Sequence, residues 1–440
     1  MSRGCKKKHK MKFSFHDTHI TPEQYQDYRE KLSPYLAHMR EVAGRGRYDA
    51  PESSLCLASD DDLRAHVTHL VKAKAPHVKL VIVVGIGGSN LGTEAVYWAL
   101  KSTEHAEMFF LETIDEQSLV DLQGLLKDLS SPEDVIVSVI SKSGGTVETI
   151  ANADILTHIM SERFGREEAL ERFVVITNKD SELWKTAVEH DMEVLEIPLA
   201  VGGRYSILSA VGLFPLACAG FDIEELHRGA VAIRNASLGE EGPAVPSAAF
   251  LAHFYNQGYN VHDTFLFEPS LEKLGMWYRQ LLAESIGKTT NSKGDDVRVG
   301  ITPTVSVGSR DLHSVFQLTL GGPRDKTATF VTTTARAGVL VVPNDGLFSS
   351  SQKDLVGKSP KEVTEALVAG AKGAYRESNV PFIEAFFSEE HVTLFEIGEF
   401  LQWKMIEIMC VAHLFDINAF NQDAIESYKK ITHRALEGGA

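Results

Sequence analysis

The sequence predicts an α/β protein with two halves, each built around its own sheet. Three observations lead to this prediction: the length of 440 residues, an alternation of short apolar runs with longer amphipathic stretches, and a polar connection near the middle of the chain. The length is about three times that of a typical domain, which favours two domains or one domain with large additions. The alternation is typical of βα units and parallel sheets.

The first half contains five short apolar runs that we expect to form one doubly wound sheet. They lie at residues 79–84, 107–111, 134–140, 173–177 and 193–197. In the stretches between them, apolar residues recur every three or four positions, as they do in amphipathic helices. These expected helices lie at residues 93–101, 117–126, 146–163 and 181–190.

The second half repeats the alternation more weakly, after a connection at residues 239–247 that is rich in Gly, Pro, Ala and Ser. We expect a second sheet with strands at residues 264–267, 297–301, 327–333, 339–342 and 382–387. The expected helices lie at residues 271–285, 312–320, 360–376 and 396–415.

The composition argues against several classes of protein. With 43% hydrophobic and 24% charged residues, the chain matches soluble globular proteins rather than disordered or membrane-embedded ones. The formal charge of −16 repels nucleic acids and anionic membranes, so any anionic ligand needs a local site. The four cysteines form no Cys-x-x-Cys pair, which indicates the thiols of a cytosolic protein. We therefore expect a cytoplasmic location.

The first ten residues carry five basic side chains and no acidic one. A signal peptide also begins with basic residues, but the segment after this start is too short and too polar to be the apolar part of a signal peptide. We expect a disordered tail.

A glycine-rich loop follows the first expected strand and opens a helix. It contains Gly87, Gly88 and Ser89, where glycines allow a close approach of the backbone and the helix N-terminus offers N–H groups to an anion. A dinucleotide-binding fingerprint needs a third glycine where Asn90 stands, which weakens that interpretation. A tight turn without a ligand is the alternative.

A second loop follows the third expected strand, again directly before a helix. It carries three hydroxyl side chains and one cation, namely Ser141, Lys142, Ser143 and Thr146. Neutral donors with one cation at a helix start suit a phosphate dianion, although Ser and Thr also serve as ordinary helix caps. Two such loops at the carboxyl ends of strands in one sheet favour a ligand site.

The remaining candidates are weaker when each is considered alone. The Gly-Lys-Thr at residues 287–289 is not a nucleotide-binding loop, because Leu282 stands where its first glycine is needed. Gln280 and Glu284 share a helix face, yet a single helix glutamate is usually a solvated surface group. His313 alone is more often structural than catalytic. No metal-ligand spacing is evident, so we expect a mechanism without a metal.

Six blocks in order resemble the phosphoglucose isomerase family in its compact bacterial form. They are Gly-Ile-Gly-Gly-Ser (85–89), Ser-Lys-Ser-Gly-Gly-Thr (141–146), Val-Gly-Gly-Arg-Tyr-Ser (201–206), the Glu-Ser-x-Gly-Lys block within 280–288, Gly-Ser-Arg-Asp-Leu-His-Ser (308–314) and Asn-Gln-Asp-Ala-Ile-Glu-Ser-Tyr-Lys (421–429). The block that ends in Arg-Tyr-Ser is the most diagnostic.

The resemblance implies two sugar isomerase domains, each a five-stranded parallel sheet flanked by helices, with a helical C-terminal segment. The expected boundaries are 1–50 for a tail and helical extension, 51–238 for the first domain, 239–395 for the second and 396–440 for the C-terminal segment. It also implies an active site between the domains of a homodimer, with a histidine supplied by the second subunit.

The resemblance implies interconversion of glucose 6-phosphate and fructose 6-phosphate through a cis-enediol, without a cofactor. Glu284 matches the catalytic base, Arg204 the arginine beside the enediolate, and His313 and Lys429 the pair associated with ring opening. The chemistry requires these types: a carboxylate to take and return a proton, a permanent cation for the enediolate, and a separate acid for the ring oxygen.

The resemblance also implies the substrate contacts. Gly87, Gly88 and Ser89 match a sugar-contacting loop, Ser141, Lys142, Ser143 and Thr146 a phosphate loop, and Gln280 and Gln422 two glutamines near the phosphate and sugar. One departure is evident, because Asp423, Ala424 and Ile425 stand where the family usually has Pro-Gly-Val. The new carboxylate near Gln422 is expected to affect substrate affinity rather than to abolish activity.

Three alternatives stay open at this point. An isomerase of the same fold that also accepts mannose 6-phosphate differs in its handling of C2 stereochemistry. A non-catalytic sugar-phosphate sensor keeps the phosphate loop but does not need Glu284, Arg204, His313 and Lys429 together. A nucleotide-dependent oxidoreductase is disfavoured by Asn90.

Overall fold

The computed structural model describes residues 10–239, 242–333, 339–388 and 391–438, and they fold as two compact units. The first unit comprises residues 38–238 and 393–402, and the second comprises the described parts of 10–37, 239–392 and 403–440. Helices α1 (Pro22–Arg45) and α15 (Leu394–Leu414) contribute residues to both units. Residues 1–9, where a disordered tail is expected, lie outside the described residues.

The first unit is built on a five-stranded parallel sheet with the strand order β3-β2-β4-β5-β6. The strands are β2 (Leu80–Val84), β3 (Glu107–Leu111), β4 (Val135–Ser141), β5 (Phe173–Thr177) and β6 (Glu193–Glu196). The helices of this unit are α2 (Ser54–Leu57), α3 (Asp61–Lys74), α4 (Leu91–Leu100), α5 (Glu116–Asp128), α6 (Val147–Phe164), α7 (Arg166–Leu170), α8 (Glu182–Glu189), α9 (Ala210–Cys218) and α10 (Ile223–Ser237). All five strands expected from the first half are confirmed.

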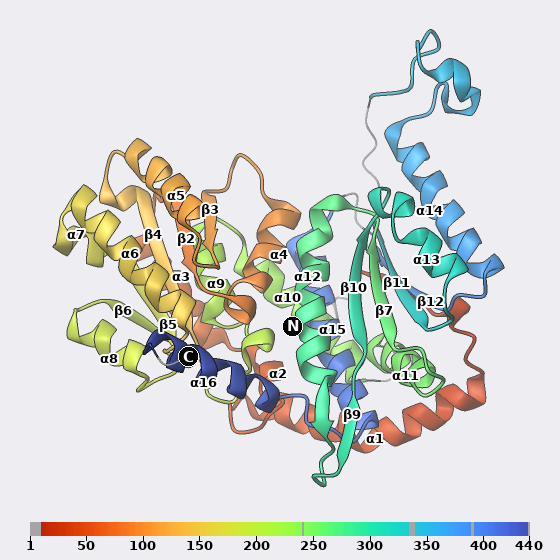
Figure 1. Ribbon diagram of the computed structural model, residues 1–440, viewed down its shortest axis with the longest axis horizontal. Coiled ribbons are helices and arrows are strands. Elements are labelled where there is room, and N and C mark those ends of the chain that lie inside the picture. Colours follow the sequence, from red (N-terminus) through yellow and green to blue (C-terminus); the bar gives the residue numbers. More distant parts are fainter. Residues whose placement is uncertain (1–9, 240–241, 334–338, 389–390, 439–440) are drawn as a thin grey trace, which may run out of the picture. The chain divides into compact units, whose positions relative to one another are not determined.

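Helices cover both faces of this sheet, as a doubly wound arrangement requires (Figure 1). Side chains at alternate positions of a strand point to opposite faces. Ile82 and Val84 of β2 join a buried cluster with Leu122 of α5 and Leu156 of α6. Helix α9 packs against β2 and β4 as well, and Val81 of β2 is equally buried. The burial of both faces explains why the central strands β2, β4 and β5 are nearly continuous apolar runs.

The second unit contains a five-stranded sheet with the order β1-β12-β11-β7-β10. Its strands are β1 (Lys12–Ser14), β7 (Val261–Leu266), β10 (Thr302–Val307), β11 (Lys326–Thr333) and β12 (Phe382–Phe387), and a separate pair is formed by β8 (Lys288–Thr290) and β9 (Asp296–Val299). The helices are α11 (Ala244–Tyr255), α12 (Glu272–Ile286), α13 (Phe316–Gly321), α14 (Pro360–Glu377) and α16 (Glu426–Leu436). Four of the five strands run parallel.

The fifth strand corrects the expectation of an all-parallel second sheet. Strand β1 pairs antiparallel with β12 at the edge of the sheet, so the chain just after its basic start forms part of the fold. Phe13 packs edge-on against Trp403 with ring centroids 4.8 Å apart. A strand of three residues is too short to show a periodic pattern, and its partner strand lies about 370 positions away in the sequence. The local pattern could therefore not reveal this pairing.

Two expected strands of the second half are wrong. Residues 339–342 form no strand, and Val339 and Leu340 are 98% and 71% exposed, because an apolar run becomes a strand only when a sheet edge is there to pair with it. Most of residues 297–301 belongs to the exposed antiparallel pair of β8 and β9, and the parallel strand of this region is β10.

Helix α12 lies against β7 and β10 with an apolar face. Buried side chains recur along it at helical spacing, among them Leu274, Tyr278 and Leu282. Gly275 permits the close approach, because a Cβ there would lie 2.8 Å from both a Leu266 and a Val305 methyl carbon. The helix is therefore seated closely on the sheet, and its last turn carries Glu284.

In the part of the chain that the structure describes, no helix combines the length and apolar character needed to span a membrane.

Candidate active site

Two loops of the first unit lie at the carboxyl ends of neighbouring strands. Strand β2 leads into the short 3-10 helix η2 (Gly87–Ser89), and β4 ends at Ser141 and leads into the loop before α6. Because β2 and β4 pair in parallel, both loops lie at the same edge of the sheet, as the sequence predicted.

A third segment packs against the first of these loops and brings Arg204 to it. This segment is the 3-10 helix η4 (Gly203–Tyr205). A Cβ on Gly88 would lie 2.3 Å from the carbonyl carbon of Gly203, so only glycine fits there. The Ser206 hydroxyl donates to the Gly203 carbonyl at 2.7 Å and also lies 3.4 Å from the Gly88 carbonyl. Arg204 is 1% exposed and therefore occupies a fixed position beside the glycine loop.

Lys142 and Arg204 place two positive charges in this part of the first unit. Burial lowers the pKa of the Lys142 ammonium, and the positive charge of Arg204 lowers this pKa further. The Lys142 ammonium donates to the Leu199 carbonyl at 2.9 Å. Two cations that disfavour each other define a place where a bound anion is stabilised.

The hydroxyl groups of the second loop are arranged around the start of α6. The side-chain oxygens of Ser141 and Thr146 are hydrogen-bonded at 2.8 Å, and the Gly145 amide donates to the Ser143 hydroxyl at 3.4 Å. Thr146 stands at the N-cap position of α6, yet its side chain makes no capping bond, so it does not satisfy the first N–H groups of that helix. Hydroxyls, helix amides and two cations together fit a phosphate group.

The second unit holds the glutamate of the candidate site between two glutamines. Gln280 donates to one carboxylate oxygen of Glu284 at 2.8 Å, and Gln422 donates to the other at 2.7 Å. We call these three residues the glutamine clamp. Gln280 lies one turn before Glu284, whereas Gln422 arrives from a segment 138 residues away. An ionised carboxylate only accepts hydrogen bonds, so both glutamine amides act as donors to it.

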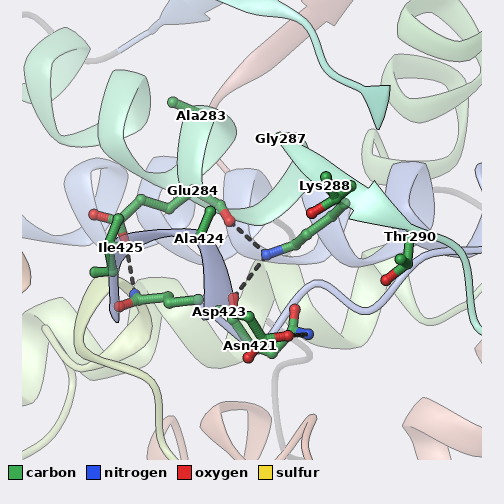
Figure 2. A pocket seen from close by; sticks show the side chains of 11 residues that line it. Ala283, Glu284, Gly287, Lys288, Thr290, Asn421, Asp423, Ala424 and Ile425 are labelled. Atoms are coloured by element: carbon green, nitrogen blue, oxygen red, sulfur yellow. Dashed lines mark hydrogen bonds between the residues drawn. The ribbon is translucent and has the colours of Figure 1, made fainter. Parts of the chain in front are cut away.

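A cavity of about 250 Å³ opens beside the clamp (Figure 2). It is lined by Ala283, Glu284, Gly287, Lys288, Thr289, Thr290, Asn421, Gln422, Asp423, Ala424 and Ile425. The 3-10 helix η9 (Asp423–Ile425) thus forms part of the wall at the position where the sequence departs from the family. The Asp423 carboxylate accepts a hydrogen bond from the Asn421 side chain at 2.7 Å.

Buried polar contacts anchor the helix that carries Glu284. The Tyr278 hydroxyl donates to Glu407 of α15 at 2.5 Å, and the Lys404 ammonium donates to both oxygens of Glu407 at 3.0 Å. Lys404 and Glu407 are 0% exposed. Burial lowers the pKa of Lys404 and raises that of Tyr278 well above its ordinary value.

His313 and Lys429 are not among the residues that line this cavity. His313 is exposed on the 3-10 helix η6 (Arg310–His313), which an Arg310–Glu272 ion pair of 3.0 Å ties to the start of α12. Lys429 is half exposed on α16, and its ammonium pairs with Glu426 at 2.8 Å. Their expected part in ring opening stays a prediction.

No group of three or more His, Cys, Asp or Glu side chains is arranged to hold a metal ion within residues 10–239, 242–333, 339–388 and 391–438.

Comparison with known proteins identifies the family. A family model described as "Phosphoglucose isomerase" matches residues 66–438. The chain belongs to this family. A probable glucose-6-phosphate isomerase of Methanococcus maripaludis is 33% identical over 81% of this chain and 78% of its own length. A glucose-6-phosphate isomerase of Carboxydothermus hydrogenoformans is 31% identical over 93% of this chain and 89% of its own length.

The fold agrees with that of a solved protein from Chlamydia trachomatis. The crystal structure of that protein, titled a glucose-6-phosphate isomerase, superposes with a TM-score of 0.81 at 19% identity, covering 97% of this chain and 88% of the other. The two-sheet α/β architecture is therefore shared with that protein. The chain is accordingly an aldose–ketose isomerase of a sugar phosphate.

Two cavity residues, Lys288 and Asn421, were not singled out from the sequence. Both belong to blocks that carry the family resemblance, which was the only signal available. Lys288 donates to backbone carbonyls, at 2.7 Å each, and no side-chain pattern encodes such contacts. Asn421 takes part through its backbone carbonyl, which accepts one of these two hydrogen bonds.

We predict that substrate affinity falls at alkaline pH because of Lys142. Its pKa is lowered, so the ammonium is lost at a lower pH than that of an ordinary lysine, and a phosphate is held less well above that pH. The KM for fructose 6-phosphate should rise at least about 2-fold between pH 7.5 and 10.5. The substrate phosphate is already a dianion throughout this range, since its second pKa is about 6.

Lys142→Arg is the matched control, because arginine keeps its charge in this range and the KM should then change by less than about 2-fold. An equal rise of the KM in both proteins would contradict the assignment of Lys142 to the phosphate.

Proposed function

We propose that the loops of the first unit and the clamp and cavity of the second unit carry out one reaction. That reaction is the interconversion of glucose 6-phosphate and fructose 6-phosphate, which membership of the phosphoglucose isomerase family assigns to this chain. The observation that carries the proposal is the glutamine clamp, which presents a carboxylate beside an open cavity.

Glu284 is proposed to move the proton between C2 and C1 of the open-chain sugar. A single carboxylate on one side of a planar cis-enediol can remove the proton from one carbon and return it to the other. Amide donors on both of its oxygens fix its orientation without neutralising it. The buried Oε1 of Gln280 has no hydrogen-bond partner among the described residues, and it is proposed to accept a hydrogen bond from a sugar hydroxyl in the complex.

The first unit is proposed to hold the anionic parts of the substrate. Arg204 stays positively charged at working pH, so it can stabilise an enediolate oxygen without donating its proton. Ser141, Lys142, Ser143 and Thr146 surround the start of α6, where the phosphate would lie, and Gly87, Gly88 and Ser89 would contact the sugar. These assignments rest on residue type and on their shared sheet edge.

His313 and Lys429 are proposed to act in ring opening, with His313 supplied by the second subunit of a homodimer. Two features support a shared site. His313 is exposed and is absent from the lining of the cavity beside Glu284. Apolar side chains next to it, Val315 and Leu318, are 46% and 54% exposed, as expected of a surface that a second copy covers.

The proposed setting of this reaction is glycolysis and gluconeogenesis in the cytoplasm. The overall charge and the absence of paired cysteines in the sequence support a reducing, aqueous compartment.

We predict that Glu284→Gln lowers kcat by about 1000-fold or more, because the variant removes the proton carrier but keeps the shape and hydrogen-bonding capacity of the side chain. The Kd for fructose 6-phosphate should change less than about 3-fold. A coupled assay of fructose 6-phosphate conversion with a chelator present measures turnover, and calorimetry measures binding. Glu365→Gln on α14 serves as the control and should match the unaltered protein. Turnover within 10-fold of normal in Glu284→Gln would remove Glu284 from the mechanism.

A second prediction concerns the shared site. His313→Ala and Glu284→Gln proteins are each nearly inactive, but a heterodimer of the two contains one intact site. An equimolar mixture with exchanged subunits should therefore recover about a quarter of normal activity, since half of the dimers are mixed and half of their sites are intact. Native mass spectrometry verifies the exchange. Verified heterodimers with no more activity than their parents would show that His313 acts within its own subunit.

A further inference from the structure

Lys288 joins the end of α12 to the segment that carries Gln422. Its ammonium donates to the backbone carbonyl of Glu284 and to that of Asn421, at 2.7 Å in each case (Figure 2). The two carbonyls are separated by 137 positions in the sequence, and the lysine side chain is half buried on the cavity wall. Lys288 is therefore a bridge between two segments of one wall.

The first of these contacts satisfies a group that the helix leaves open. Glu284 lies in the last turn of α12, where backbone carbonyls have no partner N–H within the helix. The carboxyl end of a helix also carries a partial negative charge, so a cation there is stabilised. Lys288 thus caps α12 at the residue that carries the proposed base.

The second contact fixes the residue directly before Gln422. Gln422 donates to the side chain of Glu284, whereas Lys288 holds its neighbour Asn421 to the backbone of Glu284. The contacts form a closed ring that passes from the Glu284 carbonyl through Lys288, Asn421 and Gln422 back to the Glu284 carboxylate. A change in the Lys288 contact must therefore alter where Gln422 meets the carboxylate.

We propose that Lys288 is a positioning residue for Glu284, acting by holding the Gln422 arm of the glutamine clamp at its proper distance from α12. This inference rests on the proposed role of Glu284. Lys288 transfers no proton itself, and its effect on catalysis passes through the orientation of the carboxylate. Misplacement of a reacting group by about 1 Å can cost about 100-fold in rate.

The test compares Lys288→Met, Lys288→Arg and the control Lys326→Met. Lys326 is also a partly buried lysine of the second unit that donates to a backbone carbonyl, at the start of β11 and outside the cavity lining. We expect Lys288→Met to lower kcat about 10- to 100-fold while the KM changes less than about 3-fold. Lys288→Arg, which keeps charged donors, should recover about 10-fold of that loss. Lys326→Met should keep normal kinetics.

A double-mutant cycle with Gln422→Ala separates positioning from a general structural role. If Lys288 acts by placing Gln422, then Lys288→Met should lower kcat by less than about 3-fold in the Gln422→Ala background, because the arm it positions is gone. A full additional loss in that background would overturn the proposal, and so would normal kcat in Lys288→Met. Circular dichroism and melting temperature identify any variant that fails to fold. If Lys288→Met fails to fold, Lys288→Arg replaces it in the comparison with the unaltered protein.

The outcomes also separate this inference from the proposed function. Normal turnover in Glu284→Gln would remove the base itself and with it the basis of this proposal. Loss of turnover in Glu284→Gln together with normal kcat in Lys288→Met would overturn only the role of Lys288.

Discussion

A fully buried contact between α12 and α15 sets the geometry on which the site in the second unit depends. The Lys404–Glu407 pair and the Tyr278 hydroxyl satisfy one another where neither ion meets solvent. Burying such a pair costs several kcal/mol per ion, so its benefit is better sought in a defined geometry than in added stability. Tyr278 lies six residues before Glu284 on the same helix, and its hydrogen bond limits both the rotation and the sliding of α12. The positions of the glutamine clamp, the cavity wall and the Lys288 bridge all depend on α12, which this buried contact holds in place.

The proposed phosphate site of the first unit meets a different constraint, because it has to attract an anion in a chain with a formal charge of −16. It would do so with two cations that disfavour each other, hydroxyl groups and the start of α6, all at the carboxyl edge of one parallel sheet. The chain is acidic overall, but Lys142 and Arg204 place positive charge at this edge, which favours a dianion there. The glycine at position 88 is part of the same arrangement, because only a residue without a side chain lets Arg204 lie beside the loop.

The sequence predicted the first sheet well because its central strands β2, β4 and β5 are buried on both faces and therefore appear as nearly continuous apolar runs. The second sheet was predicted less well. Strand β1 is three residues long with a distant partner, and the apolar residues 339–342 have no sheet edge to pair with. In the site, the shared face of Gln280 and Glu284 follows from helical spacing, whereas the contact of Gln422 across 138 residues was not encoded in any local pattern. No role was predicted for Lys288 beyond a rejected nucleotide-binding pattern, because its partners are backbone carbonyls, which every residue possesses.

The central claim is that one carboxylate carries a proton between two carbons of the substrate. Conversion of glucose 6-phosphate labelled with deuterium at C2, carried out in ordinary water and followed by NMR of the fructose 6-phosphate formed, tests this claim most directly. Part of the deuterium should appear at C1 and the rest should be lost to solvent, because a protonated carboxylate can exchange before it returns the proton. Complete retention of the deuterium at C1, as in a direct hydride shift, would rule out proton transfer by Glu284.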